Sequence, residues 1–430
     1  MAILKLKAPC KDYIWGGNRL REEYGKQLDS DRIAESWELS CHKDGQSVIT
    51  GGEFDGKTLS DYIAAKGKGV LGKNCGRFEY FPVLIKLIDA KDNLSVQVHP
   101  SNEYALRVEG EYGKTEMWYI VDCDPGAELL YGFKHEISKE EFAERIANNT
   151  LLEVTNNVPV HKGDVFFIES GTLHAIGKGI LIAEIQQNSN TTYRIYDYGR
   201  VGKDGKPREL HVEKAKEVTN LVPPKYPTTA QGAPTAIEGG KETLLRSCEY
   251  FNVNKLELDG TTKLTAGEGS FNSLLALGGD AVATAAGDQR HLTKSQMLLE
   301  NILQPPGLLT DLHLLIFTQL HDEHGDVAEN VGMDSELVPV HHGEHGVQMH
   351  EGAALGNVEG QHLSEGPALG KHRLRQLVDG VPLGPFRNSH RQHLGCHGAQ
   401  HHEHSLRLRA PVHHVGPGPQ VTLGNSSKTR

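Results

Sequence analysis

The chain has 430 residues, roughly three times a typical domain length, so it is long enough for two or three domains with separate cores. Its formal charge of −11, from 45 Lys and Arg against 56 Asp and Glu, argues against nonspecific nucleic-acid binding, which needs a basic surface. Six cysteines without C-x-x-C spacing favour a reducing compartment, and we expect a cytoplasmic protein. The N-terminal residues become polar too early for a signal peptide, and no apolar run approaches the ~18 residues that span a bilayer, so no membrane role is expected.

Residues 1–225 are predicted to form a mainly β domain. Short runs rich in β-branched and aromatic residues, bounded by Gly, Asn, Asp or Pro, indicate strands. The expected strands cover residues 81–88, 94–99, 116–121, 164–168, 180–185 and 193–198. Many short strands of this kind favour a barrel or jelly roll.

A small helical insertion is expected near residues 138–155. Ser138 can cap the helix, and Glu141 can close the capping box. Phe142 and Ile146 share one face, which would pack against the sheet.

A second β-rich, cupin-like domain is expected at residues 230–290, after the Pro-rich link at residues 222–227. Its strands are predicted at residues 251–258, 262–266, 273–277 and 281–285. Because the strand signals fade near residue 290, we expect this domain to be incomplete.

Residues 291–430 differ in composition from the rest of the chain. They hold 18 of the 24 histidines, no Trp or Tyr and only two Phe, so they are poor in the residues that build a sheet core. Such His-rich tracts can bind metal adventitiously, but a low-complexity segment without a site is the preferred interpretation. A change of reading frame near residue 290 is a sharper hypothesis, and it predicts that this segment is disordered.

The polar residues that could carry chemistry lie between residues 86 and 200. Side chains alternate across a strand, so in the run at 94–99 Leu94, Val96 and Val98 share one face and Gln97 and His99 share the other. Gln97 and His99 are therefore predicted to point to the same side.

Two further residues can join His99. The same alternation places Lys114 beside Glu116, provided that the strand has begun by then. His174 follows a Gly-Asp turn, an apolar strand and a Gly turn, a pattern that resembles the second cupin motif; His99 and Glu116 match the first motif loosely. Two imidazoles and a carboxylate suit zinc with an open coordination position, and the ligand types also allow redox-active iron.

Other residues carry a structural interpretation. A lone histidine in a β-protein is usually exposed or hydrogen-bonded, and this is expected of the remaining ones in the first 290 residues. They are His42, His135, His161 and His211. Trp15, Trp37 and Trp118 are expected in the core or a pocket wall.

Taken together, the motifs resemble those of the type I mannose-6-phosphate isomerases of the short bacterial kind, which are zinc-dependent enzymes of the cupin superfamily. The motifs follow in the order that this family has, and the resemblance fades near residue 290. They are Tyr13-Ile-Trp15-Gly-Gly, Glu35-Ser-Trp37-Glu38, the run from Lys86 to Pro100, Gly113-Lys114-Thr-Glu116-Met-Trp118, Gly171-Thr-Leu-His174 and the run from Glu184 to Arg194.

The resemblance implies a metal site. The zinc ligands of the family match His99, Glu116 and His174, and Gln97 stands at the place of a further ligand seen in some members. One Zn²⁺ per chain is therefore expected.

The resemblance also implies a reaction, the interconversion of mannose 6-phosphate and fructose 6-phosphate. The family's active-site arginine matches Arg194, and its lysines match Lys114 and Lys86, so Arg194 and Lys114 are expected to be catalytic and Lys86 and Arg194 to bind the hexose 6-phosphate. Isomerisation through an enediol needs a base, an acid and an electrophile, and zinc, Lys114 and Arg194 suit such roles. The group that removes the C2 proton and the oligomeric state stay open.

Two other classes of function stay open. A cupin that only binds a sugar phosphate would need the metal and the arginine but not Lys114. A cupin iron dioxygenase would consume O₂ and lose activity with zinc. Both are kept because a fold alone does not determine function.

Overall fold

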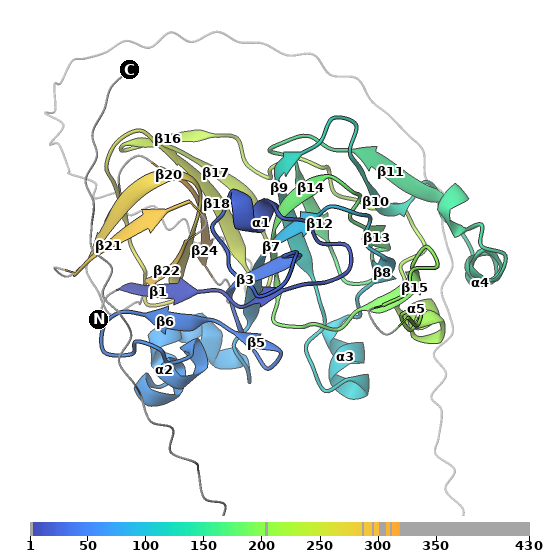
Figure 1. Ribbon diagram of the computed structural model, residues 1–430, viewed down its shortest axis with the longest axis horizontal. Coiled ribbons are helices and arrows are strands. Elements are labelled where there is room, and N and C mark those ends of the chain that lie inside the picture. Colours follow the sequence, from blue (N-terminus) through green and yellow to red (C-terminus); the bar gives the residue numbers. More distant parts are fainter. Residues whose placement is uncertain are drawn as a thin grey trace, which may run out of the picture. The chain divides into compact units, whose positions relative to one another are not determined.

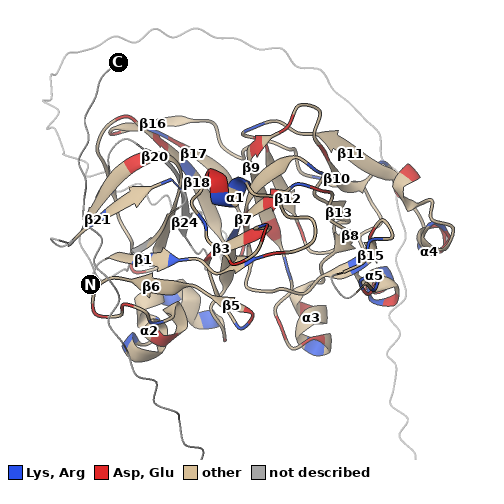
Figure 2. Cartoon of the chain, viewed as in Figure 1, with Lys and Arg blue, Asp and Glu red and all other residues tan. Residues whose placement is uncertain are grey.

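A computed structural model describes residues 3–202, 205–285, 288–294, 296–300, 307–309 and 312–318 of the chain, all within one compact unit (Figure 1). The fold is mainly β, as predicted. Among the described helices none is long and apolar enough to cross a membrane. In the coloured part of the cartoon, Lys and Arg are interspersed with Asp and Glu along the strands and helices (Figure 2).

The first sheet has six antiparallel strands in the order β12-β9-β14-β7-β3-β2. Their bounds are Val165–Ile168, Glu116–Cys123, Ile180–Gln187, Val83–Ala90, Glu35–Leu39 and Cys10–Lys11. β14 lies between β9 and β7, and its register places Glu184 opposite both Trp118 and Lys86. Every residue of β7 and β14 is buried, because both faces of this sheet are covered.

The second sheet has five strands in the order β11-β10-β13-β8-β15. Their bounds are Thr155–Pro159, Glu128–Phe133, His174–Ala175, Val96–Val98 and Tyr193–Tyr196. One core cluster holds Trp118 and Ile182 from the six-stranded sheet together with Leu129 and Tyr131 from this one. The two sheets therefore pack face to face, which is the predicted jelly-roll arrangement.

The strand faces follow the predicted alternation with one exception. Val96 and Val98 are buried in a core cluster on the outer side of the five-stranded sheet. Leu94 precedes β8 and packs in the cluster between the sheets instead, so the prediction that it shares their face is wrong. The alternation fails there because it holds only within a strand.

A third, eleven-stranded sheet has the order β16-β17-β18-β24-β20-β22-β1-β6, with β19, β21 and β23 paired off this path. In that path order the bounds are Thr235–Ile237, Gly240–Ser247, Asn252–Leu258, Leu312–Thr318, Asn272–Ala285, Met297–Glu300, Ile3–Lys7 and Val48–Thr50. β19, β21 and β23 cover Thr262–Leu264, Asp288–Thr293 and Gly307–Leu309.

This sheet departs from the predicted domain bounds at both ends. β1 and β6 come from the N-terminal region, so residues 1–225 supply strands to this sheet as well as to the jelly roll. β22 and β24 pair with β20, so the strands continue past residue 290 to Thr318. The runs Met-Leu-Leu-Glu and Leu-His-Leu-Leu-Ile-Phe-Thr carry the apolar residues of these strands, a local signal that the average over 140 residues conceals. Residues 319–430, and with them most of the predicted His-rich segment, lie outside the described residues.

The described part of the chain has five α-helices beside the sheets: α1 Arg19–Glu22, α2 Leu59–Lys66, α3 Asn102–Val108, α4 Lys139–Ala147 and α5 Val212–Val218. The predicted insertion contains α4 and a 3₁₀ turn, Leu151–Glu153. The Ser138 hydroxyl accepts from the Glu141 amide, as predicted for its cap. The Glu141 carboxylate pairs with Arg145 at 2.7 Å rather than closing a capping box, because that partner lies one turn along the same face.

Candidate active site

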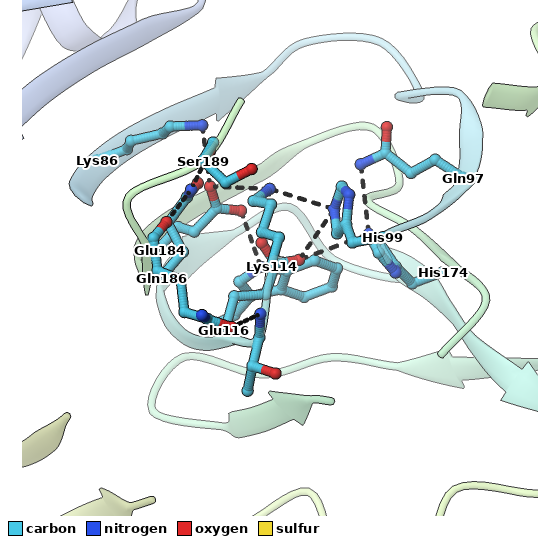
Figure 3. Close-up of polar contacts among 12 residues, drawn as sticks. Lys86, Gln97, His99, Lys114, Glu116, His174, Glu184, Gln186 and Ser189 are labelled. Atoms are coloured by element: carbon cyan, nitrogen blue, oxygen red, sulfur yellow. Dashed lines mark hydrogen bonds and ion pairs between the residues drawn. The ribbon is translucent and has the colours of Figure 1, made fainter. Parts of the chain in front are cut away.

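The predicted ligand residues meet between the two jelly-roll sheets (Figure 3). Gln97 lies on β8 directly opposite His174 on β13. Glu116 begins β9 on the other sheet, and His99 follows the end of β8. His99, Glu116 and His174 are fully buried, and their ligand atoms lie within 4.8 Å of one another.

One carboxylate oxygen is the centre of this cluster. Glu116 Oε1 lies 3.6 Å from His99 Nε2 and 3.5 Å from His174 Nε2. It accepts no hydrogen bond within the described part of the chain. A buried carboxylate oxygen without a donor is costly unless a cation stands nearby.

Backbone carbonyls set the tautomer of both imidazoles. His99 Nδ1 lies 2.9 Å from the Thr191 carbonyl oxygen, and His174 Nδ1 lies 2.8 Å from that of Thr172. Because a carbonyl accepts only, each Nδ1 carries the proton and each Nε2 presents a lone pair to Glu116. Three acceptor atoms therefore converge.

The ionisation states favour a bound cation. Burial lowers the pKa of His99 well below its ordinary value, and Lys114 and His174 lower it further. Burial also lowers the pKa of His174, so both rings are neutral near pH 7. For Glu116 burial opposes ionisation, but Lys114 and His174 outweigh it and hold the pKa below its usual value. Two neutral imidazoles and one carboxylate form a donor set that fits a divalent metal ion.

Gln97 reaches the cluster with its amide nitrogen. Gln97 Nε2 lies 3.3 Å from His174 Nε2, and the Ser95 hydroxyl donates to Gln97 Oε1 at 3.4 Å. An amide ligates metal through its oxygen, so a ligand role for Gln97 requires a half-turn of the amide group.

A chain of alternating charges extends from the cluster along the six-stranded sheet (Figure 3). Lys114 Nζ lies 2.7 Å from Glu116 Oε2 and 3.2 Å from His99 Nε2, although β9 begins only at Glu116. It also lies 3.7 Å from Glu184 Oε1, which pairs with Lys86 at 3.2 Å. Burial disfavours the charged form of Lys86, but Glu35 and Glu184 outweigh it and raise the pKa of this lysine, so it remains protonated.

Arg194 lies apart from this chain, on β15. It is paired with Gln97 in the register of β8 and β15. Its guanidinium donates to the Ser95 hydroxyl at 3.2 Å and to the Glu209 carbonyl at 3.0 Å. Burial lowers the pKa of Arg194, yet a guanidinium keeps its charge near pH 7.

Sequence reasoning missed two carboxylates of this site. The indole Nε1 of Trp118 donates to Glu184 at 3.0 Å, and that of Trp37 donates to Glu35 at 2.7 Å. Glu184 interrupts the apolar run Ile-Leu-Ile-Ala-Glu-Ile of a buried strand, and this was the signal that could have revealed it; Glu35 stands in the more polar run Glu-Ser-Trp-Glu-Leu, which gives no such signal.

The tryptophans and histidines that were given structural roles can also be placed. Trp15, Trp37 and Trp118 are buried, as predicted. His161 is exposed and pairs with Asp164. His42 is buried, with its ring Nδ1 accepting from the Asp44 amide, so it fits the hydrogen-bonded rather than the exposed alternative.

Residues 3–119 match the family model "Phosphomannose isomerase type I, catalytic domain". The chain is 42% identical over 261 residues to a mannose-6-phosphate isomerase of Streptococcus mutans, covering 61% of this chain and 80% of that protein. It is 43% identical over 262 residues to one of Bacillus subtilis, covering 61% and 81%. A crystal structure of a Bacillus subtilis mannose 6-phosphate isomerase superposes with a TM-score of 0.69 at 32% identity, covering 74% of this chain and all of that one. The chain belongs to the type I phosphomannose isomerase family.

Proposed function

We propose that this protein is a zinc-dependent aldose-ketose isomerase that interconverts mannose 6-phosphate and fructose 6-phosphate through an enediol. Membership of the family supports the substrate and reaction. The hexose phosphate substrate suits the cytoplasmic location expected from composition, and the five described cysteines are all free.

The observation that carries the proposal is the convergence of acceptors on Glu116 Oε1. His99 and His174 each turn an Nε2 lone pair toward this oxygen, and a backbone carbonyl fixes each ring from its other side. Such second contacts are typical of imidazoles that ligate metal.

His99, Glu116 and His174 would hold one Zn²⁺ per chain, with Gln97 as a further ligand after its amide turns. When bound, zinc acts as a Lewis acid that polarises the substrate oxygens. Three protein ligands leave a coordination position open, as in catalytic rather than structural zinc sites.

Lys114 and Glu184 are the groups best placed to move protons. Isomerisation transfers a proton between C1 and C2 and needs a second transfer at the carbonyl oxygen. Lys114 Nζ would hold a proton beside the ligand atoms, and Glu184 Oε1, 3.7 Å away, would accept or return it. This pair connects the proposed metal site with Lys86.

Arg194 and Lys86 would bind the anionic substrate. The guanidinium offers several donors in a fixed plane, which matches phosphate or enediolate oxygens. Lys86 carries a buried positive charge at the other end of the chain of charges. The chain as a whole is acidic, so these residues would supply the local positive potential.

A coupled isomerase assay on chelated and zinc-restored protein tests the proposal. We expect activity to vanish with chelation and to return with stoichiometric Zn²⁺. Chelated protein with full activity would overturn the zinc dependence. Hexose phosphate binding without turnover would instead favour a binding cupin. O₂ consumption with Fe²⁺, lost with Zn²⁺, would favour a dioxygenase, which uses the same ligand types.

A further inference from the structure

The carbonyl that orients His99 belongs to a short turn that several side-chain hydrogen bonds hold in place. This turn, residues 188–192, joins β14 to β15. The Ser189 hydroxyl accepts from the Thr191 amide at 3.2 Å, and the Gln186 amide group donates to the Ser189 carbonyl at 2.6 Å. These contacts hold the turn from the side of the six-stranded sheet.

A second set of anchors comes from Glu111, a residue with no role in the proposed chemistry. The Thr191 hydroxyl donates to Glu111 Oε2 at 3.3 Å. The backbone amide of Asn190 is also among the groups that lower the pKa of the Glu111 carboxylate. Glu111 therefore holds the side chain of Thr191, the residue whose carbonyl faces His99 Nδ1.

A hairpin far from the metal ligands in sequence holds Glu111 in turn. Strands β4 (Cys41–His42) and β5 (Gly45–Gln46) form this hairpin. His42 Nε2 lies 3.7 Å from Glu111 Oε2, and Lys43 forms an ion pair with Glu111. Because the Asp44 amide donates to His42 Nδ1, the ring proton lies on Nε2, the atom facing Glu111. Asp44 Oδ2 also accepts from the Asn190 side chain at 2.9 Å.

We propose that Glu111, through Thr191, is a positioning residue for the His99 imidazole and so tunes the affinity and geometry of the metal site. The inference rests on the proposed metal role of His99. The path is continuous: the hairpin holds Glu111, Glu111 holds Thr191, and the Thr191 carbonyl accepts from His99 Nδ1. Outer partners of this kind fix ring orientation and commonly change metal affinity by about 10–100-fold when removed.

The test measures metal binding rather than turnover. We would titrate Zn²⁺ into the full chain in competition with a chromophoric chelator, and record the visible absorption of the Co²⁺-substituted protein. Thr191→Val removes the hydroxyl and keeps the side-chain shape, whereas Thr191→Ser keeps the hydroxyl and removes the methyl group. Glu111→Gln removes the charge from the other side of the same bond.

We expect Thr191→Val and Glu111→Gln each to weaken Zn²⁺ binding by about tenfold and to shift the Co²⁺ bands. The double variant should bind Zn²⁺ about as weakly as the weaker-binding of the two single variants, since both changes break the same path. Thr191→Ser should bind like the parent. Glu257→Gln is the matched control: its carboxylate is similarly exposed and pairs with Lys255 at 3.2 Å, but it lies on the eleven-stranded sheet.

Parent-like zinc affinity and Co²⁺ spectra in Thr191→Val and Glu111→Gln would overturn the inference. If Glu111→Gln does not fold, as judged by circular dichroism, the Thr191→Val and Thr191→Ser pair decides alone. Because the readout is metal binding, a protein that binds zinc normally but isomerises no hexose phosphate would refute the proposed function and leave this inference standing.

Discussion

The jelly-roll region and the C-terminal part of the eleven-stranded sheet bury different kinds of side chain. Every buried Asp, Glu, Lys or His among the side chains whose burial the structure describes lies between Glu35 and Asp197. From residue 205 to residue 300, the buried polar residues of the described part are only Thr, Ser and Asn. Burying a charge is costly unless a partner compensates, so the adjacent buried charges of Lys86, Glu184 and Lys114 support the functional role proposed for them. The proposed chemistry therefore belongs to the jelly roll, and we expect the third sheet to contribute mainly to stability.

The largest expected effect follows from removing a ligand. His174→Ala or His99→Ala should remove stoichiometric zinc and reduce turnover by at least about a hundredfold, because a three-ligand site cannot lose an imidazole and keep its affinity. Metal analysis and the isomerase assay measure both. His161→Ala is the control, with a side chain 81% exposed. Full zinc occupancy with full activity in either ligand variant would refute the site.

Truncating a core side chain of the third sheet should instead lower the stability of the protein and leave its metal site intact. Leu256 is fully buried on β18, and Leu256→Ala should lower the free energy of unfolding by about 2–5 kcal/mol. Zinc affinity and turnover per folded molecule should not change. Urea denaturation measures the first and the chelator titration the second. Leu210→Ala, at a residue 46% exposed, should have little effect on either. A Leu256→Ala protein with normal stability but weak metal binding would contradict the division between the regions.

Arg194→Lys separates geometry from charge. A lost charge-assisted hydrogen bond is worth about 1.5–3 kcal/mol, so kcat/KM should fall by about 10–100-fold while zinc content stays normal. Steady-state kinetics with both sugar phosphates measure this fall. Parent-like kinetics would mean that Arg194 only braces Ser95 and the Glu209 carbonyl.

Asp197 gives a pH-dependent effect at the edge of the jelly roll. Burial disfavours its ionised form, but hydrogen bonds from Arg208 and Arg200 outweigh this and hold the pKa of Asp197 below its ordinary value. A carboxyl with a lowered folded-state pKa contributes stability above its unfolded pKa, ~3.9, and loses it as the pH falls through the folded value. Asp197→Asn should therefore cost about 1–3 kcal/mol at pH 7, with the difference from the parent shrinking below about pH 4. Denaturation from pH 3 to pH 7 measures it, and a pH-independent difference would be contrary to expectation.

The smallest effect is expected from shortening the chain. The Bacillus subtilis structure is covered completely by 74% of this chain, and the compact unit that contains all described residues ends at Met333. A chain that stops there should keep zinc binding and turnover within about twofold, since every residue assigned to the site precedes Arg200. A severe loss of activity in the shortened chain would assign residues 334–430 a function.

Local patterns predicted more of the site than of its surroundings. His99, Glu116 and His174 follow from motif spacing, and the structure brings them together. Glu184 did not follow, because its role depends on pairing with Lys86, almost a hundred residues away in β7. The contact of the Thr191 carbonyl with His99 could not be predicted either, because backbone acceptors carry no sequence signal. The strands beyond residue 290 were missed because composition was averaged across short apolar runs and the polar sequence after them.

The position of β1 in the third sheet affects how the chain folds during translation. β1 is synthesised before the other described strands, yet it lies between β6 and β22, and β22 comes almost 300 residues later. At about 5–20 residues per second, translation leaves one side of β1 without its neighbour for roughly 15–60 s. During that time β1, with Ile3 and Leu4 that are buried in the finished protein, has an unpaired edge on the side of β22. Refolding from denaturant must also close this long loop, so we expect it to be slow and to yield less native protein as concentration rises.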